Sequence, residues 1–175
     1  MRGSQRGLFD VGDLAEISGD GKRRYILRRG RPPRLGFIML NPSTADATRD
    51  DPTVRRCKGF AERLGFAGVV IGNLFSWRAT RPAALLEALL VGEAGPTSAC
   101  DAALRAVIAE SEALVFAWGA SCERSPEAMK QIADVEGLAG ALGASPKALG
   151  FTYAGHPRHP LYASYGESLS CYPRE

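Results

Sequence analysis

Residues 35–46 read Leu35-Gly36-Phe37-Ile38-Met39-Leu40-Asn41-Pro42-Ser43-Thr44-Ala45-Asp46, a short apolar run that stops at a polar turn. An uncharged run of this length is typical of a strand buried on both faces, and Asn-Pro is a turn signal. In open α/β sheets, ligands bind just outside the carboxyl ends of such strands. The polar side chains after Leu40 therefore lie where a binding site is expected, although simple turn and helix-capping chemistry would also explain them.

Three later apolar runs end in the same way. They are residues 69–75, which contain Asn73; residues 113–120, which contain Trp118-Gly119; and residues 149–153, which precede His156. Helical patterns lie between the runs, at 52–64, 83–90, 99–110 and 126–142. The first of these helices has Asp51 as its expected N-cap and Pro52 at its first position.

Strands that alternate with helices predict a three-layer α/β/α sandwich with a mostly parallel sheet. Residues 1–175 are expected to form a single α/β domain, in which residues 1–14 are a flexible leader. A further strand is expected at 24–28, and a hairpin would lead from it into the central strand at 35–40. The carboxyl ends of the four main strands would then bring Asn41, Asn73, Trp118 and His156 to one edge of the sheet.

The composition is that of a globular protein, with 45% hydrophobic and 23% charged residues. The net charge of +3 permits nucleic-acid binding but does not argue for it. The basic residues are unevenly distributed, and two groups stand out. Such groups suit a phosphate-bearing partner, and a solvated basic face would explain them equally. The groups are Lys22, Arg23, Arg24, Arg28, Arg29, Arg31 and Arg34, and Arg49, Arg55, Arg56, Lys58 and Arg63.

The four cysteines are widely scattered and have no spacing that indicates a metal or cluster site. Together with the absence of a signal-like N-terminus, they predict reduced thiols in a cytoplasmic protein. No apolar run is long enough to span a bilayer, so no membrane association is expected. No cofactor or metal is implied, and the sequence does not indicate an oligomeric state.

The motifs of several enzyme classes are missing. The predicted edge of the sheet has no adjacent acid pair, no Gly-x-Ser-x-Gly elbow and no Walker-type glycine-rich loop. No cysteine lies in a turn that would expose it as a nucleophile beside His156. What remains is amide, imidazole and hydroxyl chemistry: an asparagine can read a base edge, and a histidine can donate to an oxygen on which charge develops.

The chain resembles, from about Ala15 to Tyr172, an uncharacterised bacterial and phage family known as domain of unknown function 1643. Its hallmarks are present as Leu40-Asn41-Pro42-Ser43-Thr44-Ala45-Asp46, Asp51-Pro52-Thr53, Gly72-Asn73-Leu74-Phe75, Ala117-Trp118-Gly119 and Gly155-His156-Pro157-Arg158-His159-Pro160-Leu161. That resemblance implies almost no biochemistry.

The order of these motifs is also similar, more remotely, to that of the uracil-DNA glycosylase superfamily. This second resemblance implies a uracil-DNA-glycosylase-like fold, a DNA or nucleotide partner, and hydrolysis of the N-glycosidic bond of a flipped base. It implies that Asn41 places water and that His156 stabilises the departing base. The implied base-binding residues are Asn73, Phe75 and Ser43, and the implied nucleic-acid-binding residues are Arg55, Arg56, Arg78, Arg81, Arg158 and His159.

The chain departs from the glycosylase pattern at three points. Thr53 stands where those enzymes place a phenylalanine that stacks on the base, and Trp77 stands near the position of a cluster-binding cysteine. The histidine loop also carries an extra residue. Two alternatives therefore stay open: a non-catalytic nucleic-acid-binding module, and an enzyme that acts on a small nucleotide.

Overall fold

Strand β3, Arg34–Met39, forms the centre of the sheet and is buried along its whole length. The computed structural model describes residues 12–173, in which seven strands have the order β1-β2-β4-β3-β5-β6-β7. On either side of β3 lie β4, Gly68–Asn73, and β5, Ser111–Phe116, and both are parallel to it. The carboxyl ends of these three strands therefore meet at one edge of the sheet, as predicted.

The outer strands are mostly antiparallel. On one side, β2, Arg24–Gly30, pairs with β4 and with β1, Leu14–Ile17. On the other side, β6, Lys147–Ala148, runs parallel to β5, and β7, Ser170–Cys171, pairs antiparallel with β6. The predicted α/β sheet with a parallel centre is confirmed. The hairpin expected between β2 and β3 is wrong, because β4 lies between them in the sheet.

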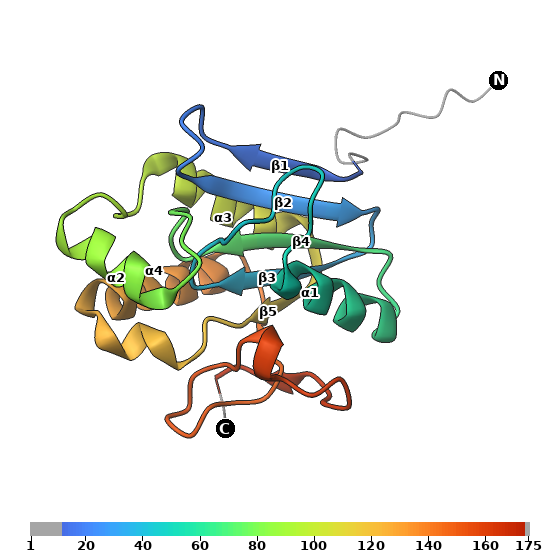
Figure 1. Ribbon diagram of the computed structural model, residues 1–175. Coiled ribbons are helices and arrows are strands. Elements are labelled where there is room, and N and C mark those ends of the chain that lie inside the picture. Colours follow the sequence, from blue (N-terminus) through green and yellow to red (C-terminus); the bar gives the residue numbers. More distant parts are fainter. Residues whose placement is uncertain (1–11, 174–175) are drawn as a thin grey trace.

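Helices cover both faces of the sheet (Figure 1). On one face lies α1, Pro52–Arg63, and on the other lie α2, Pro82–Leu90, α3, Ser98–Glu110, and α4, Pro126–Ala141. Two short 3-10 helices, η1 at Ala120–Arg124 and η2 at Pro160–Tyr162, complete the described elements. This arrangement confirms the predicted three layers.

The alternation of side chains along β3 divides the core into two parts. Phe37 and Met39 pack in the cluster under α1, whereas Ile38 and Leu40 pack in the cluster under α2, α3 and α4. Because successive strand residues point to opposite faces, an uninterrupted apolar run is needed to fill both clusters.

Helix α1 begins where the sequence predicts. Asp51 is its N-cap, and the Asp51 carboxylate accepts a hydrogen bond from Val54 N at 2.9 Å. Pro52 occupies the first turn, where its missing N–H has no cost. The apolar positions Val54, Cys57, Phe60 and Ala61 are buried against the sheet.

The C-terminal part differs from the prediction. The strand expected at 149–153 is wrong, since β6 ends at Ala148. Gly150 has a φ of +75° and turns the chain, after which Phe151 forms an isolated bridge to Pro157 instead of continuing a strand. At the other end, Leu14 begins β1 rather than belonging to the expected leader, and the rest of that prediction, at residues 1–11, lies outside the described residues.

Many of the N-terminal arginines are internal. Arg24, Arg29 and Arg34 are buried. Arg28 pairs with Glu110 at 2.6 Å, and Arg29 pairs with Asp50 at 2.8 Å. These residues contact other parts of the protein through their side chains and are not available to a phosphate-bearing partner. Within the described range, no helix has the length and apolar character needed to cross a membrane.

Candidate functional site

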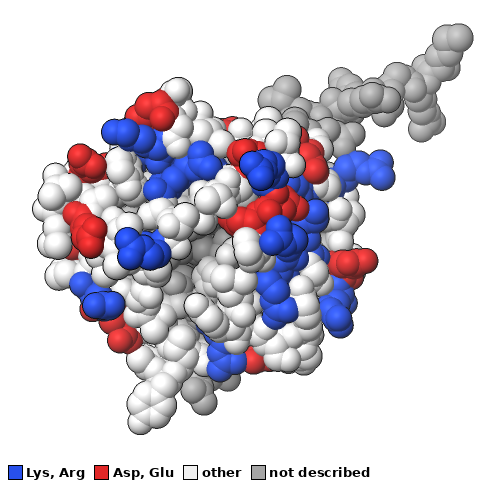
Figure 2. All heavy atoms as spheres, viewed as in Figure 1, with Lys and Arg blue, Asp and Glu red and all other residues white. Residues whose placement is uncertain are grey.

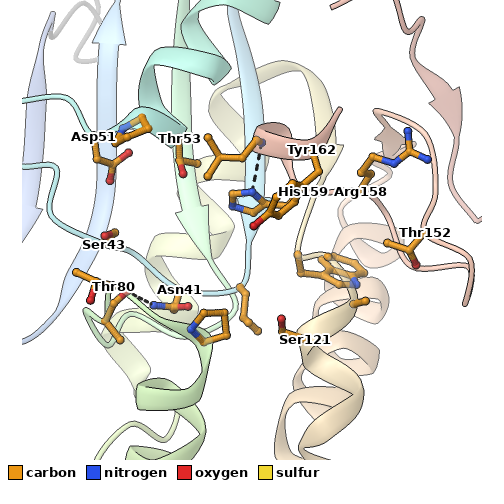
Figure 3. Close-up of a pocket in the computed structure, with 18 residues that line it drawn as sticks. Asn41, Ser43, Asp51, Thr53, Thr80, Ser121, Thr152, Arg158, His159 and Tyr162 are labelled. Carbon is orange, nitrogen blue, oxygen red and sulfur yellow. Dashed lines mark hydrogen bonds between the residues drawn. The ribbon is translucent and has the colours of Figure 1, made fainter. Parts of the chain in front are cut away.

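A cavity of about 590 Å³ opens at the carboxyl ends of β3, β4 and β5 (Figure 3). Four loops form it: the loop after β3, the loop after β4, the turn into η1, and the loop that leads into η2. We call it the cavity. The residues that line it are Leu40, Asn41, Ser43, Asp51, Pro52, Thr53, Ala79, Thr80, Pro82, Trp118, Gly119, Ala120, Ser121, Thr152, Arg158, His159, Leu161 and Tyr162.

Asn41 lines the cavity directly after β3, as its position in the sequence predicts. Its Nδ2 group donates to Ala79 O at 2.9 Å and to Pro42 O at 3.1 Å. These two bonds fix the orientation of the amide and join the loop after β3 to the loop after β4. They leave Oδ1 as the atom that can accept a hydrogen bond in the cavity.

His159 is the histidine that lines the cavity. Its Nδ1 accepts a hydrogen bond from Leu161 N at 3.4 Å, which assigns the proton of the neutral ring to Nε2. Burial lowers the pKa of His159 to about 4, and the nearby charge of Asp51 only partly offsets this effect. At neutral pH His159 is therefore an uncharged imidazole with one N–H donor, and in Figure 3 its second ring nitrogen is turned toward Thr53.

Trp118 forms part of the cavity wall. It is only 2% exposed, it lines the cavity, and its Nε1 has no hydrogen-bond partner among the described residues. Buried donors are almost always paired, so this one is an exception, and because the Nε1 atom has almost no accessible surface, Trp118 lines the cavity with the rest of its indole ring. The next residue, Gly119, has a φ of +75°, which favours glycine, and a Cβ there would be in ordinary contact with the Cβ of His159 at 3.4 Å.

Asp51 also lines the cavity, although its sequence pattern predicted only a capping role. The carboxylate accepts from Val54 N at 2.9 Å and from Ala45 N at 3.3 Å, and the residue is 6% exposed. It also lies close enough to the buried Arg24 to raise its pKa, although burial outweighs this and lowers the pKa of Arg24 to about 10. Asp51 thus holds the loop and helix that form one wall.

His156 lies behind the cavity wall and is not among the lining residues. Its Nε2 is 3.0 Å from Glu123 Oε1, and its Nδ1 is 3.6 Å from Cys122 Sγ. Cys122 is fully buried, and burial raises its thiol pKa to about 11, so it does not supply a thiolate nucleophile at neutral pH. His156 instead joins the histidine loop to η1.

Of the three residues predicted to bind a base, one lines the cavity and two do not. Ser43 lines the cavity. Asn73 is 3% exposed and lies outside the lining, and its Nδ2 has no hydrogen-bond partner among the described residues. Phe75 is fully buried in the core under α2 and α3 and offers no free ring face.

Two of the arginines predicted to bind phosphate make contacts within the protein. Arg56 donates to the carbonyls of Pro160 and Ala163, and its guanidinium lies 3.6 Å from the centre of the Tyr165 ring. Arg158 lines the cavity and pairs with Glu167.

Two other arginines remain at the surface. Arg55 is exposed and donates to Asp50 O at 2.6 Å, and Arg81 is exposed at the start of α2. Arg78 donates to three backbone carbonyls, of Gly21, Ser43 and Thr44. Figure 2 shows Lys and Arg side chains gathered over α1 on this face, interspersed with acidic ones.

Sequence reasoning did not single out Thr80, Ser121 and Thr152 as site residues, although all three line the cavity. Single hydroxyl residues in loops carry no pattern that marks them as part of a site. Within the part of the chain that the structure describes, there is no group of three or more His, Cys, Asp or Glu that could hold a metal ion.

Comparison with known proteins gives one match. The family model described as "Protein of unknown function (DUF1643)" matches residues 24–161, which is most of the chain and includes every loop of the cavity. No curated protein and no solved structure matches the chain.

Proposed function

We propose that the chain, which belongs to the family described as "Protein of unknown function (DUF1643)", recognises a nucleobase within DNA and hydrolyses its N-glycosidic bond. The observation that carries this proposal is the set of polar groups that line the cavity. Asn41, His159 and Trp118 line the same space: Asn41 offers an amide oxygen, His159 offers a ring N–H, and the indole ring of Trp118 forms part of the wall.

The size and lining of the cavity suit a planar heterocycle. Its volume of about 590 Å³ is within the range of small-molecule sites, roughly 300–1,000 Å³. Apart from the few polar groups, the lining is made of aliphatic, aromatic and hydroxyl side chains, which match the faces and edges of a base. A base in an intact duplex cannot reach such a recess, so it enters flipped out or from a single strand.

His159 suits the departure of the base. When the bond between C1′ and the base nitrogen breaks, negative charge develops on the base. A neutral imidazole can donate its Nε2–H to an oxygen of the base without transferring the proton, and this stabilises the charge as it forms. The low pKa of His159 supports this role at neutral pH.

Asn41 suits the placement of water. With Nδ2 held by two carbonyls, its Oδ1 can accept a hydrogen bond from a water beside C1′. In the balanced reaction, the C1′–N electron pair moves to the base and the water oxygen bonds to C1′. The proton that water loses ends on the released base. The order of motifs shared with the uracil-DNA glycosylase superfamily supports the same reaction class.

A cleavage assay tests the proposal. Labelled oligonucleotides that carry uracil, hypoxanthine, xanthine or a mismatched thymine are incubated with enzyme in excess and then treated with alkali, which breaks the strand at abasic sites. Wild type is compared with Asn41→Ala, His159→Ala and His156→Ala, and thermal melting confirms that each variant is folded.

We expect wild type to release at least one of these bases. Loss of a single positioned donor typically lowers a rate by about 100-fold or more, so His159→Ala should show such a loss. His156→Ala should retain more activity, since His156 lies behind the wall. Wild type that binds the oligonucleotides without releasing any base would refute hydrolysis of these bases and favour a binding module.

A further inference from the structure

A second hollow adjoins the cavity. We call it the groove; its volume is about 470 Å³, and it is lined by Gly21, Lys22, Ser43, Thr44, Trp77, Arg78, Ala79, Thr80 and Ala84. Three of these residues, Ser43, Ala79 and Thr80, also line the cavity. The two hollows therefore share a wall made of the loop after β3 and the loop after β4, and a ligand in one can extend into the other.

The groove is electropositive. Lys22 and Arg78 line it, and no Asp or Glu does. Arg78 donates to Ser43 O at 3.1 Å, to Gly21 O at 3.2 Å and to Thr44 O at 3.1 Å. These bonds use three of the five N–H groups of a guanidinium and leave about two for a ligand. Since carbonyls carry no net charge, Arg78 keeps its full positive charge.

An aromatic ring lies beside these charges. Trp77 is half-buried in the groove wall, and Lys22 Nζ lies 5.8 Å from its ring centroid. Lys22 is exposed, so its ammonium can move to meet a ligand. A backbone-binding cation next to an aromatic surface is the usual combination in sites that hold a single nucleic-acid strand. Figure 2 shows Lys and Arg side chains near the turn between β1 and β2, which carries Gly21 and Lys22.

We propose that the groove binds the phosphate of the nucleotide next to the base held in the cavity, so that the substrate is a DNA strand rather than a free nucleoside or mononucleotide. This inference rests on the proposed function. Arg78 and Lys22 contact the phosphate, and Thr44, which is exposed at the groove, contacts it or the adjoining sugar. Arg78 in addition positions both loops that the two hollows share.

A binding experiment tests the groove separately from the cavity. Fluorescein-labelled 12-nucleotide single strands, carrying each of the four bases in turn, are titrated with protein at 50, 100 and 200 mM NaCl and followed by fluorescence anisotropy. The groove variants are Lys22→Ala, which removes a charge, and Thr44→Glu, which adds a repulsive one. The control is Lys130→Ala, which removes an exposed lysine from α4.

We expect Lys22→Ala to weaken strand binding about 3- to 10-fold and to reduce the salt slope by about 0.7, the contribution of one phosphate contact to a single strand. Thr44→Glu should weaken it by about 10-fold or more, and Lys130→Ala by less than about 2-fold. Competition by deoxyuridine 5′-monophosphate should be the same for wild type and both groove variants. Melting temperatures identify any loss that comes from unfolding.

The outcomes separate the two proposals. If wild type binds the strands and the groove variants keep its affinity and salt slope, the groove inference is wrong and the proposed function stands. If the groove variants weaken the mononucleotide by the same factor as the strand, the groove holds the nucleotide's own phosphate and the strand inference is overturned. If wild type neither binds nor cleaves any strand, the proposed function itself fails.

Discussion

Acidification from pH 7 to pH 5 should destabilise the protein through His159. Burial lowers the pKa of this imidazole from 6.5 to about 4 in the folded state. The unfolded chain takes up a proton near pH 6.5, whereas the folded protein does so only near pH 4. Between these values the unfolded state binds more protons, so stability is full above about pH 6.5 and falls as the pH falls toward 4.

The magnitude follows from the two pKa values. Integrated from pH 7 to pH 5, the difference in proton binding amounts to about 2 kcal/mol at 1.36 kcal/mol per pH unit. His159 is half-buried, so solvent screening reduces the effect of its titration on stability. We therefore expect the free energy of unfolding to fall by about 1–2 kcal/mol between pH 7 and pH 5.

Urea unfolding at 25 °C and pH 7, 6 and 5 measures this loss. His159→Gln cannot take up the proton, so its stability should fall less than that of wild type by about 1–2 kcal/mol, while the carboxylates titrate equally in both proteins. Equal pH dependence in wild type and His159→Gln would refute the reasoning.

Four further substitutions test the supports of the site and the packing of the fold. Asp51→Ala removes the cap of α1 and a negative charge close to the buried Arg24. It should lower the free energy of unfolding by about 2 kcal/mol or more in urea melts. An unchanged urea midpoint would contradict the capping role. Arg56→Met removes two hydrogen bonds to backbone carbonyls, so amide hydrogen exchange should accelerate in residues 160–165 while the rest of the chain keeps its protection. Gly68→Ala places a Cβ 2.4 Å from a backbone oxygen and should destabilise the protein by more than about 2 kcal/mol. Gly137→Ala adds a Cβ in open space within α4 and should stabilise the protein by about 0.5–1 kcal/mol. Thermal melts that rank the two variants in the opposite order would contradict this packing.

The central elements were predictable because each has a local signal. The run at 35–40 has to fill two core clusters, and Asp51-Pro52 marks the start of a helix in any context. The edge strands were not predictable in the same way. β1 has four residues, and β6 and β7 have two each, so their pairing partners define them rather than their own composition.

The site was predictable only in outline. Asn41 and Trp118 could be placed because they follow buried strands that end together. The resemblance gave the catalytic role to His156, whereas His159 is the histidine that lines the cavity; both follow the same turn, and only packing decides which one reaches it. For the arginines, charge in the sequence did not reveal that Arg29 and Arg34 have acidic partners far along the chain.

The order of the strands in the sheet has a consequence for the growing polypeptide. When the growing chain has emerged from the ribosome as far as residue 73, β4 is available on one side of β3, but β5, at Ser111–Phe116, is still to come. Until β5 emerges, β3 presents an apolar unpaired edge, which is a template for aggregation. Nascent chains whose emerged part ends in α2 or α3 should therefore be ones that chaperones must hold, whereas chains that have emerged beyond residue 150 should not.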